Sequence, residues 1–161
     1  MSARGPFRVV GQSVRRTDAL EKVLGRAQYL GDMELPGMAH ARLLRSPHAH
    51  ARIVRVDVAR ARAHPGVHAV LTAADLGWCE PFYGPALRDR PILATDVVRY
   101  EGEPVVAVAA VDEATAAEAL DLVEVDYDEL PAAMTLEDAL APGAPLVHEE
   151  FGTNVGGHWS H

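Results

Sequence analysis

The sequence contains a single cysteine and no long apolar run, and each of these absences excludes a class of protein. Cys79 alone cannot form a disulfide framework within the chain, and it cannot hold an iron–sulfur cluster, which takes about four thiolates. The longest apolar stretch, PVVAVAAV (Pro104–Val111), is far shorter than the roughly 20 residues of a membrane-spanning helix. The first residues lack the apolar core of a secretion signal, so we expect a cytoplasmic protein with no membrane partner.

Positive charge is also scarce. Lys and Arg number 15 against 23 Asp and Glu, which gives a net charge of −8. An acidic surface repels phosphate backbones, so nucleic acid is not an expected partner. The glycine-rich motifs that cradle dinucleotides and nucleoside triphosphates, GxGxxG and GxxxxGK[ST], are absent.

What the chain does have is the composition of one ordinary globular domain. It has 161 residues, of which 48% are hydrophobic, and a chain of this length buries roughly 70% of its unfolded surface. Residues 1–22 are polar and basic and predict an N-terminal arm, residues 23–150 predict the folded domain, and the glycine-rich residues 151–161 predict a flexible tail or linker.

Alternating apolar and polar residues predict several strands in the first half of the chain. GRAQYLGD (residues 25–32) reads as a short strand. MAHARLLR (38–45) and ARIVRVD (51–57) flank Ser46-Pro47-His48, and because proline disfavours helix at the preceding residue, they predict a strand–turn–strand hairpin. VHAVL (67–71) predicts a further strand.

The second half predicts a buried strand, a helix and an amphipathic strand. PVVAVAAV is continuously apolar, which is typical of a strand buried on both faces. Asp112 is a suitable N-cap for the best helix, with a capping box at Thr115–Glu118. VEVDYDEL (123–130) alternates cleanly, and Thr135 caps a last short helix. The order predicts an α+β fold with a mixed sheet, one long helix and two or three short ones.

Three histidines raise the question of a metal site. His48 and His50 form a His-x-His pair, and His40 could approach them from a neighbouring strand, so three nitrogens for zinc are geometrically conceivable. His48, however, sits in a proline turn, and no carboxylate or cysteine lies nearby in the sequence to complete the site. We therefore interpret them as surface or turn histidines and expect no metal ligand.

The other chemical features also favour structural roles. Glu124, Asp126 and Asp128 would share one strand face, a pattern that a solvated strand edge produces more often than a paired-carboxylate active site. Cys79 lies beside Glu80, which would raise its thiol pKa, so we do not expect a nucleophile. From the residues alone we predict no catalytic and no cofactor-binding residue.

Several long motifs in order resemble one family. Three stretches are similar to consecutive blocks of the molybdenum hydroxylases. In chain order they are RSPHAHARIVRVD, HPGVHAVLTAADL and RPILATDVVRYEGEPVVAVAAVDEATAAEALDLVEVDYDELPA. These are the xanthine dehydrogenases, aldehyde oxidases and carbon monoxide dehydrogenases. VGQSVRRTDALEKVLGRAQYLGD resembles the family's entry, and PLVHEE followed by Asn154 resembles its exit.

The resemblance implies the α/β-hammerhead domain that opens the large, molybdenum-carrying subunit. The molybdopterin-binding part would follow it, so residues 151–161 would lead toward that part. The chain would then be a subunit encoded by a split gene or a truncated segment. Its role would be to shape a surface that docks on the molybdenum domain. The family turns that would form this surface are Arg45, Ser46, Pro47, His48, Gly102, Glu103 and Pro104.

The implied activity belongs to a larger enzyme, and the isolated chain is expected to be inactive. By resemblance, the holoenzyme would use molybdopterin-bound molybdenum, [2Fe-2S] clusters and often FAD, none of them held by this chain alone. Its partners would be a molybdopterin-binding chain or domain, an iron–sulfur subunit and in some cases a flavin subunit. Two alternatives stay open: a free-standing binding module derived from the domain, and a small zinc hydrolase using the three histidines. Neither substrate nor electron acceptor follows from the sequence.

Overall fold

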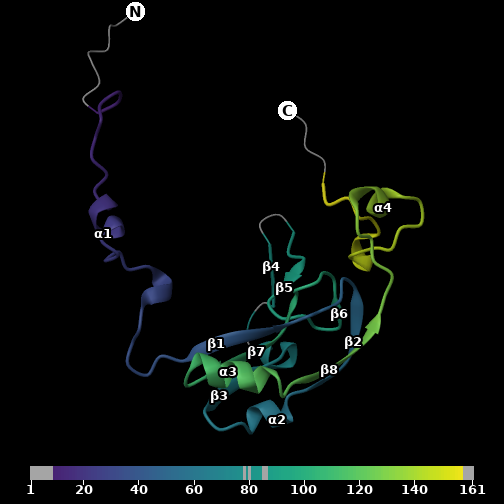
Figure 1. The fold of residues 1–161 in the computed structure, drawn as a ribbon. Helices are drawn as coiled ribbons and strands as arrows, with labels where there is room; N and C mark the ends of the chain where they lie inside the picture. Colours follow the sequence, from purple (N-terminus) through teal and green to yellow (C-terminus); the bar gives the residue numbers. More distant parts are fainter. Residues whose placement is uncertain (1–8, 78, 80, 85–86, 158–161) are drawn as a thin grey trace, which may run out of the picture. The chain divides into compact units, whose positions relative to one another are not determined.

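The computed structural model describes residues 9–77, 79, 81–84 and 87–157, and the chain forms two compact units, residues 1–36 and 37–161 (Figure 1). The predicted arm falls within the first unit and the predicted tail within the second. The first unit contains the helix α1 (Ala19–Val23) and the 3-10 helix η1 (Leu30–Asp32), neither of which buries a residue.

The strand predicted over residues 25–32 is wrong. No strand occurs among residues 9–36. The Asp32 carboxylate accepts a hydrogen bond from the Tyr29 N–H at 3.0 Å, and this contact closes a tight helical turn where the sequence suggested extended chain.

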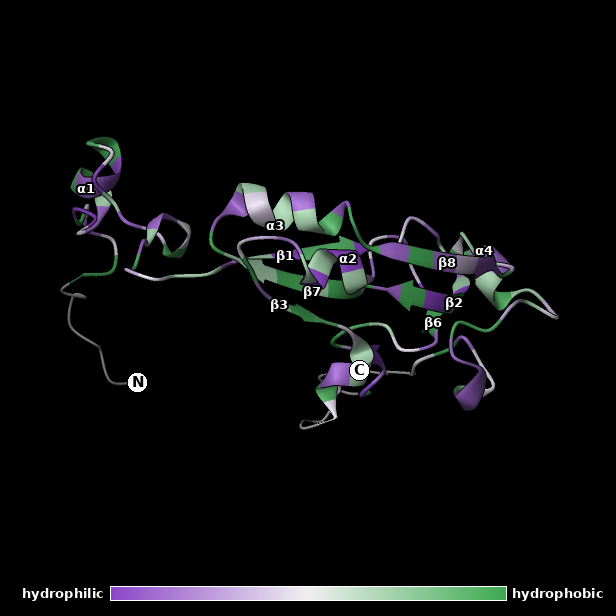
Figure 2. Cartoon of the chain, turned by 90° about the horizontal axis from the view of Figure 1, so that it is seen from below, coloured by the Kyte–Doolittle hydropathy of each residue, from purple (hydrophilic) through white to green (hydrophobic). Residues whose placement is uncertain are grey.

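The second unit is built on two three-stranded antiparallel sheets. The first has the strand order β1-β7-β3 and the second the order β6-β2-β8 (Figure 2). The strands β4 and β5 form a separate two-stranded ladder. The strands are β1 (His40–Arg45), β2 (Ala51–Asp57), β3 (Val67–Leu71), β4 (Phe82–Tyr83), β5 (Arg90–Pro91), β6 (Val97–Val98), β7 (Pro104–Ala110) and β8 (Glu124–Glu129). The α+β class is confirmed, but the pairings among the described strands are antiparallel rather than those of a mixed sheet.

The predicted hairpin between β1 and β2 is also wrong. β1 pairs with β7 and β2 pairs with β6 and β8, so the two strands belong to different sheets. The physical reason lies in the connection: the Ser46 backbone bonds to the turn that precedes β7, and the His50 carbonyl accepts from the Leu130 N–H at 3.0 Å. These long-range bonds direct the chain from one sheet into the other.

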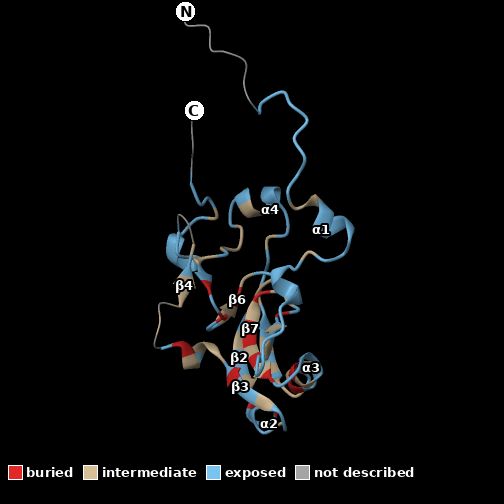
Figure 3. Ribbon diagram, turned by 90° about the vertical axis from the view of Figure 1, so that its left-hand side faces the viewer, coloured by how far each residue is buried: buried red, intermediate tan, exposed pale blue. Residues whose placement is uncertain are grey.

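The helix α3 (Glu113–Leu120) lies against β1, β7 and β3 (Figures 1 and 3). Its predicted N-cap is confirmed, since the Asp112 carboxylate accepts the Thr115 N–H at 2.7 Å. The remaining helices of the second unit are α2 (Ala59–Arg62), α4 (Leu136–Leu140), η2 (Ala73–Leu76) and η3 (Glu149–Phe151). Thr135 caps α4 as predicted, by accepting the Asp138 N–H at 3.1 Å.

The core lies between α3, α2 and the inner faces of both sheets. Its centre consists of small and β-branched residues, among them Ala51, Val98, Val106, Val108 and Ala119, each at most 1% exposed. The alternation predicted for β8 is confirmed: Val125 and Tyr127 pack against this cluster, whereas the acidic side chains between them are exposed. In the part of the chain that the structure describes, no helix is long and apolar enough to cross a membrane.

Candidate functional site

The connection between β1 and β2 is joined to the turn between β6 and β7 through the backbones of Ser46 and Glu103. The Ser46 N–H donates to the Glu103 carbonyl oxygen at 2.9 Å, and the Gly102 N–H donates to the Ser46 carbonyl oxygen at 2.8 Å. The Arg45 guanidinium donates to the Gly102 carbonyl oxygen at 2.8 Å. The structure therefore brings together the two distant stretches that sequence reasoning had assigned to one surface.

The Ser46 side chain stabilises the proline turn from inside. Its hydroxyl oxygen accepts the His48 N–H at 3.0 Å, and Ser46 is only 2% exposed. Serine hydroxyls commonly close such turns by accepting an N–H two residues on. Pro47 between them is exposed, so the turn presents its ring to solvent while its polar groups are satisfied within the chain.

Glu103 is a buried carboxylic acid with a local partner. Its side chain accepts the Arg99 N–H, and the residue is 1% exposed. Burial raises the pKa of the Glu103 carboxyl, and the hydrogen bond from Arg99 opposes the shift. Burial likewise raises the pKa of the neighbouring Tyr100 hydroxyl. The Glu103 side chain therefore stabilises the turn before β7 and does not face solvent.

The residues of the predicted docking surface differ in exposure. Ser46 and Glu103 are buried, so their side chains are not available to a partner. The other members of the set remain accessible, Arg45 and Pro47 fully and the rest in part. The half-buried members are His48, Gly102 and Pro104.

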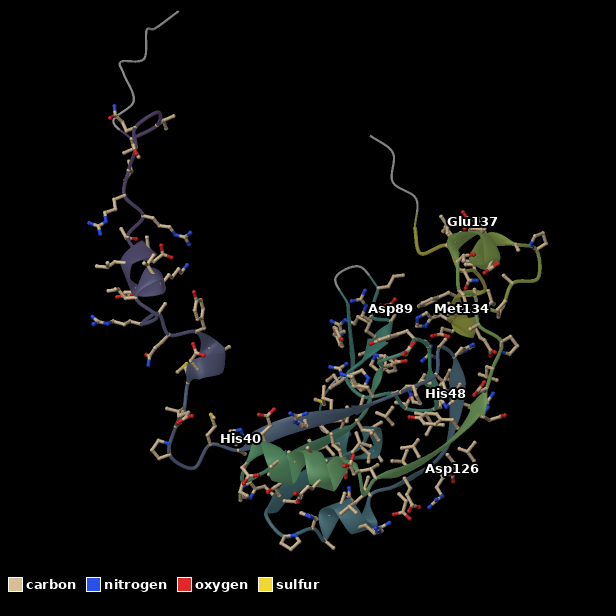
Figure 4. The ribbon with its side chains drawn as sticks, viewed as in Figure 1. His40, His48, Asp89, Asp126, Met134 and Glu137 are labelled. Atoms are coloured by element: carbon tan, nitrogen blue, oxygen red, sulfur yellow. The ribbon has the colours of Figure 1, made fainter. Side chains whose placement is uncertain are left out.

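The three histidines do not converge. His40 begins β1 and His48 lies beyond its other end (Figure 4). The His48 Nδ1 lies 3.2 Å from a Glu129 carboxylate oxygen, and its ring packs against that of Tyr127 with centroids 4.8 Å apart. The His50 Nδ1 lies 2.7 Å from the Pro131 carbonyl oxygen.

Two members of the acidic row on β8, Glu124 and Asp126, form ion pairs with arginines. Arg55 on β2 contacts Asp126 at 2.8 Å and Glu124 at 3.4 Å, and Arg60 on α2 also reaches Glu124 at 3.4 Å. These carboxylates therefore form exposed ion pairs across neighbouring elements, as the structural interpretation of the row implied.

Sequence reasoning did not predict the contacts by which Arg99 and Asn154 hold residues 145–154, which we call the exit segment. The Arg99 guanidinium donates to the Val147 carbonyl oxygen at 3.1 Å. The Asn154 amide donates to the carbonyl oxygens of Ala139 and Pro145, and its oxygen accepts the Val147 N–H, each at 3.0 Å. Because Val147 lies 48 residues beyond Arg99, no local spacing could have revealed this contact.

A pocket of about 210 Å³ lies beside this segment, with His50, Arg99, Tyr100, Met134 and Val147 among its lining residues. Figure 4 marks Met134 near the exit segment. Cofactor and drug-sized sites usually occupy roughly 300–1,000 Å³, so this pocket is small for a pterin.

The residues of this chain do not fit the cofactors of a molybdenum hydroxylase. In residues 9–157, apart from the undescribed positions, no group of three or more His, Cys, Asp or Glu side chains is arranged to hold a metal ion. His48, His50, Glu124 and Asp126 are engaged with other groups, and one thiol cannot supply the ligands of an iron–sulfur cluster. The turns, hydrogen bonds and ion pairs described above thus make up a structural framework.

Comparison with known proteins identifies the framework. Residues 24–131 match the family model described as "Aldehyde oxidase and xanthine dehydrogenase, a/b hammerhead domain". The chain is 40% identical over 144 residues to the carbon monoxide dehydrogenase large chain of Afipia carboxidovorans, a match that covers 88% of this chain and 18% of that one. It is 38% identical over 149 residues to the nicotinate dehydrogenase large molybdopterin subunit of Eubacterium barkeri, covering 92% and 34%.

A solved structure agrees with these matches. The Cu,Mo-containing carbon monoxide dehydrogenase superposes with a TM-score of 0.80 at 41% identity, over 87% of this chain and 18% of that one. The chain therefore spans about a fifth to a third of the length of these relatives. With a family model that covers most of its length and a matching fold, the chain belongs to the α/β-hammerhead domain family of the molybdenum hydroxylases.

Proposed function

We propose that the chain is a noncatalytic hammerhead part of a molybdenum-dependent hydroxylase or dehydrogenase, and that it packs against the molybdopterin-binding part to complete the enzyme. The observation that carries the proposal is the match of nearly the whole chain to less than a fifth of a carbon monoxide dehydrogenase large chain. A second relative is named a large molybdopterin subunit, which indicates the cofactor expected of the part that this chain would pack against.

The arrangement of these residues favours a structural role over a catalytic one. Backbone hydrogen bonds between Ser46 and Glu103 join two turns into one corner, and the described residues include no group of three or more side chains suited to a metal ion. Hydroxylation needs a pocket from which water is excluded, and a rigid neighbouring domain helps to wall such a pocket. We propose that the accessible members of the corner contribute to that contact. They are Arg45, Pro47, His48, Gly102 and Pro104.

The wider assembly follows from the same proposal. Its other partners would be an iron–sulfur subunit and, in some enzymes of this kind, a flavin subunit, and residues 151–161 would lead toward the molybdopterin-binding part. The chain would act in the cytoplasm and, by itself, would oxidise no substrate.

Affinity purification from the native cells tests this function. The chain, tagged at its own chromosomal locus, is expected to elute with a polypeptide of several hundred residues that resembles the remaining four-fifths of the relatives, or as part of one such polypeptide. Mass spectrometry identifies it. Recovery of a free protein of about 17 kDa, the mass of the chain alone, would contradict the proposal.

A further inference from the structure

One face of the sheet β1-β7-β3 carries neighbouring aliphatic residues, most of which are exposed, and Arg45 follows them at the end of β1. The other face is the one that α3 contacts, because Arg42 on β1 forms an ion pair with Glu113 on α3. Side chains alternate along a strand, so Ala41 and Leu43 point to the opposite side.

The neighbouring strands place matching residues on that side. Val70 of β3 and Val108 of β7 belong to the buried core and pair with each other, so the residues next to them face away from it. The pairing register of the three strands then places these residues in two rows across the sheet. The rows are Leu43, Ala107 and Leu71, and Ala41, Ala109 and Ala69. We call these six residues the aliphatic face.

The aliphatic face is accessible in this chain. Leu43 is 40% and Leu71 is 39% exposed, Ala41 and Ala69 are exposed, and the alanines of β7 are half-buried. Figure 2 shows the hydrophobic colouring of these strands, and Figure 3 shows α3 on one side of them.

An exposed sheet face of this composition is unusual. Antiparallel sheets that face water on one side normally carry polar residues there. Contiguous apolar patches on soluble proteins mark interaction sites, and a flat apolar sheet with open edges invites unwanted strand pairing. The continuous apolar sequence of β7 also has the composition of a strand covered on both sides, whereas this chain covers only one fully.

We infer that the aliphatic face is the principal docking surface of the chain, and that its occupant is an apolar surface of the molybdopterin-binding part of a large subunit. This inference rests on the proposed function and names its interface. The occupant follows from length: relatives about 40% identical carry this segment within chains of which it is less than a fifth, so most of what can cover the face lies outside these 161 residues.

Hydroxyl-radical footprinting of the native assembly tests the interface. Leu43 and Leu71 should be labelled readily in the isolated full-length chain, and in the assembly their labelling should fall to that of the buried Val70. Val54 on β2, which is 63% exposed, serves as a reference outside the aliphatic face and should label equally in both samples.

Substitution gives an independent readout. Leu43→Glu should lower recovery of the molybdopterin-binding companion at least about tenfold, because a charge would be buried in an apolar contact. Val54→Glu is the matched control and should leave recovery unchanged. Circular dichroism and thermal unfolding of both variants establish that each is folded, and Leu71→Ser provides a milder change on the same face.

The outcomes separate this inference from the proposed function. If the wild-type chain has no molybdopterin-bearing companion, the proposed function fails. If the companion binds while Leu43 and Leu71 stay fully labelled, only the interface is wrong. Two further results would overturn the assigned occupant. One is protection of Leu43 and Leu71 from labelling already in the isolated chain, and the other is a dimer of the isolated chain that Leu43→Glu dissociates.

Discussion

The Ser46 N–H donates to the Glu103 carbonyl oxygen at 2.9 Å, and both residues are buried, at 2% and 1% exposure. This bond joins the connection that leaves the first sheet to the turn that enters β7. The two turns that resemble family motifs are thus one structural unit, and Glu103 holds it by accepting the Arg99 N–H.

Replacing Glu103 should separate the effect of its hydrogen bond from that of its charge. Glu103→Ala leaves the Arg99 N–H without its partner and should lower the free energy of unfolding by about 1–3 kcal/mol. Glu103→Gln keeps an acceptor oxygen and removes a buried charge, so it should be neutral or stabilising at pH 7. Urea unfolding of the full chain measures both, and equal destabilisation by the two variants would refute this role.

The pH dependence of stability should carry the sign of a raised pKa at Glu103. Burial raises its folded pKa above the unfolded value, so its favourable contribution is present in full below the ordinary pKa near 4.5 and is lost as the pH rises through the folded value. The stability advantage of Glu103→Gln over the wild type should therefore be largest at pH 7 and shrink toward pH 4.5. An advantage that grew on acidification would contradict this assignment.

Asp75 should behave in the opposite way. Hydrogen bonds from the Thr72 N–H and hydroxyl, both 2.8 Å long, lower the pKa of the Asp75 carboxyl below its usual 3.8. Its contribution is present above 3.8 and is lost as the pH falls through the depressed value. Asp75→Asn should therefore destabilise the chain at pH 7, and the difference from the wild type should vanish in strong acid. A constant difference across this range would show that ionisation is irrelevant.

Asn154 should control the order of the exit segment. Asn154→Ala removes hydrogen bonds to Ala139, Pro145 and Val147 and should cost about 1–2 kcal/mol locally. Hydrogen exchange at the Val147 amide should accelerate. Asn154→Asp keeps the acceptor for Val147 and loses the two donors, so it should protect this amide better than alanine does. If hydrogen exchange at the Val147 amide is unchanged in both variants, Asn154 does not order this segment.

Zinc should not stabilise the chain. The ring of His50 is engaged with the Pro131 carbonyl and that of His48 with Glu129, and His40 lies at the far end of β1. A ligand at a hundred times its Kd would add about 2.7 kcal/mol of stability, which thermal unfolding detects readily. A zinc-dependent rise in Tm that His48→Ala abolishes would revive the metal-site interpretation.

Local patterns in the sequence were sufficient for some elements and not for others. Asp112 before α3, Thr135 before α4 and the alternation around Tyr127 each act within a few residues, and these predictions are confirmed. The β1–β2 hairpin failed because backbone bonds between Ser46 and the distant Glu103 decide where the chain goes.

The candidate site shows the same limit. Family motifs pointed to two turns that the structure brings together, but a motif does not state which of its residues are buried, and Ser46 and Glu103 are. The aliphatic face escaped notice because it combines alternate residues of three strands whose register only the fold supplies. The role of these residues in docking, the division at residues 22 and 150, and the cytoplasmic location remain predictions.

The molar ratio of molybdenum to this chain, measured by elemental analysis of material purified from native cells, tests the central claim most directly. The account predicts about one molybdenum per copy in the assembly and none in the chain separated from its companion. Native assemblies without molybdenum, or stoichiometric molybdenum retained by the isolated chain, would contradict it.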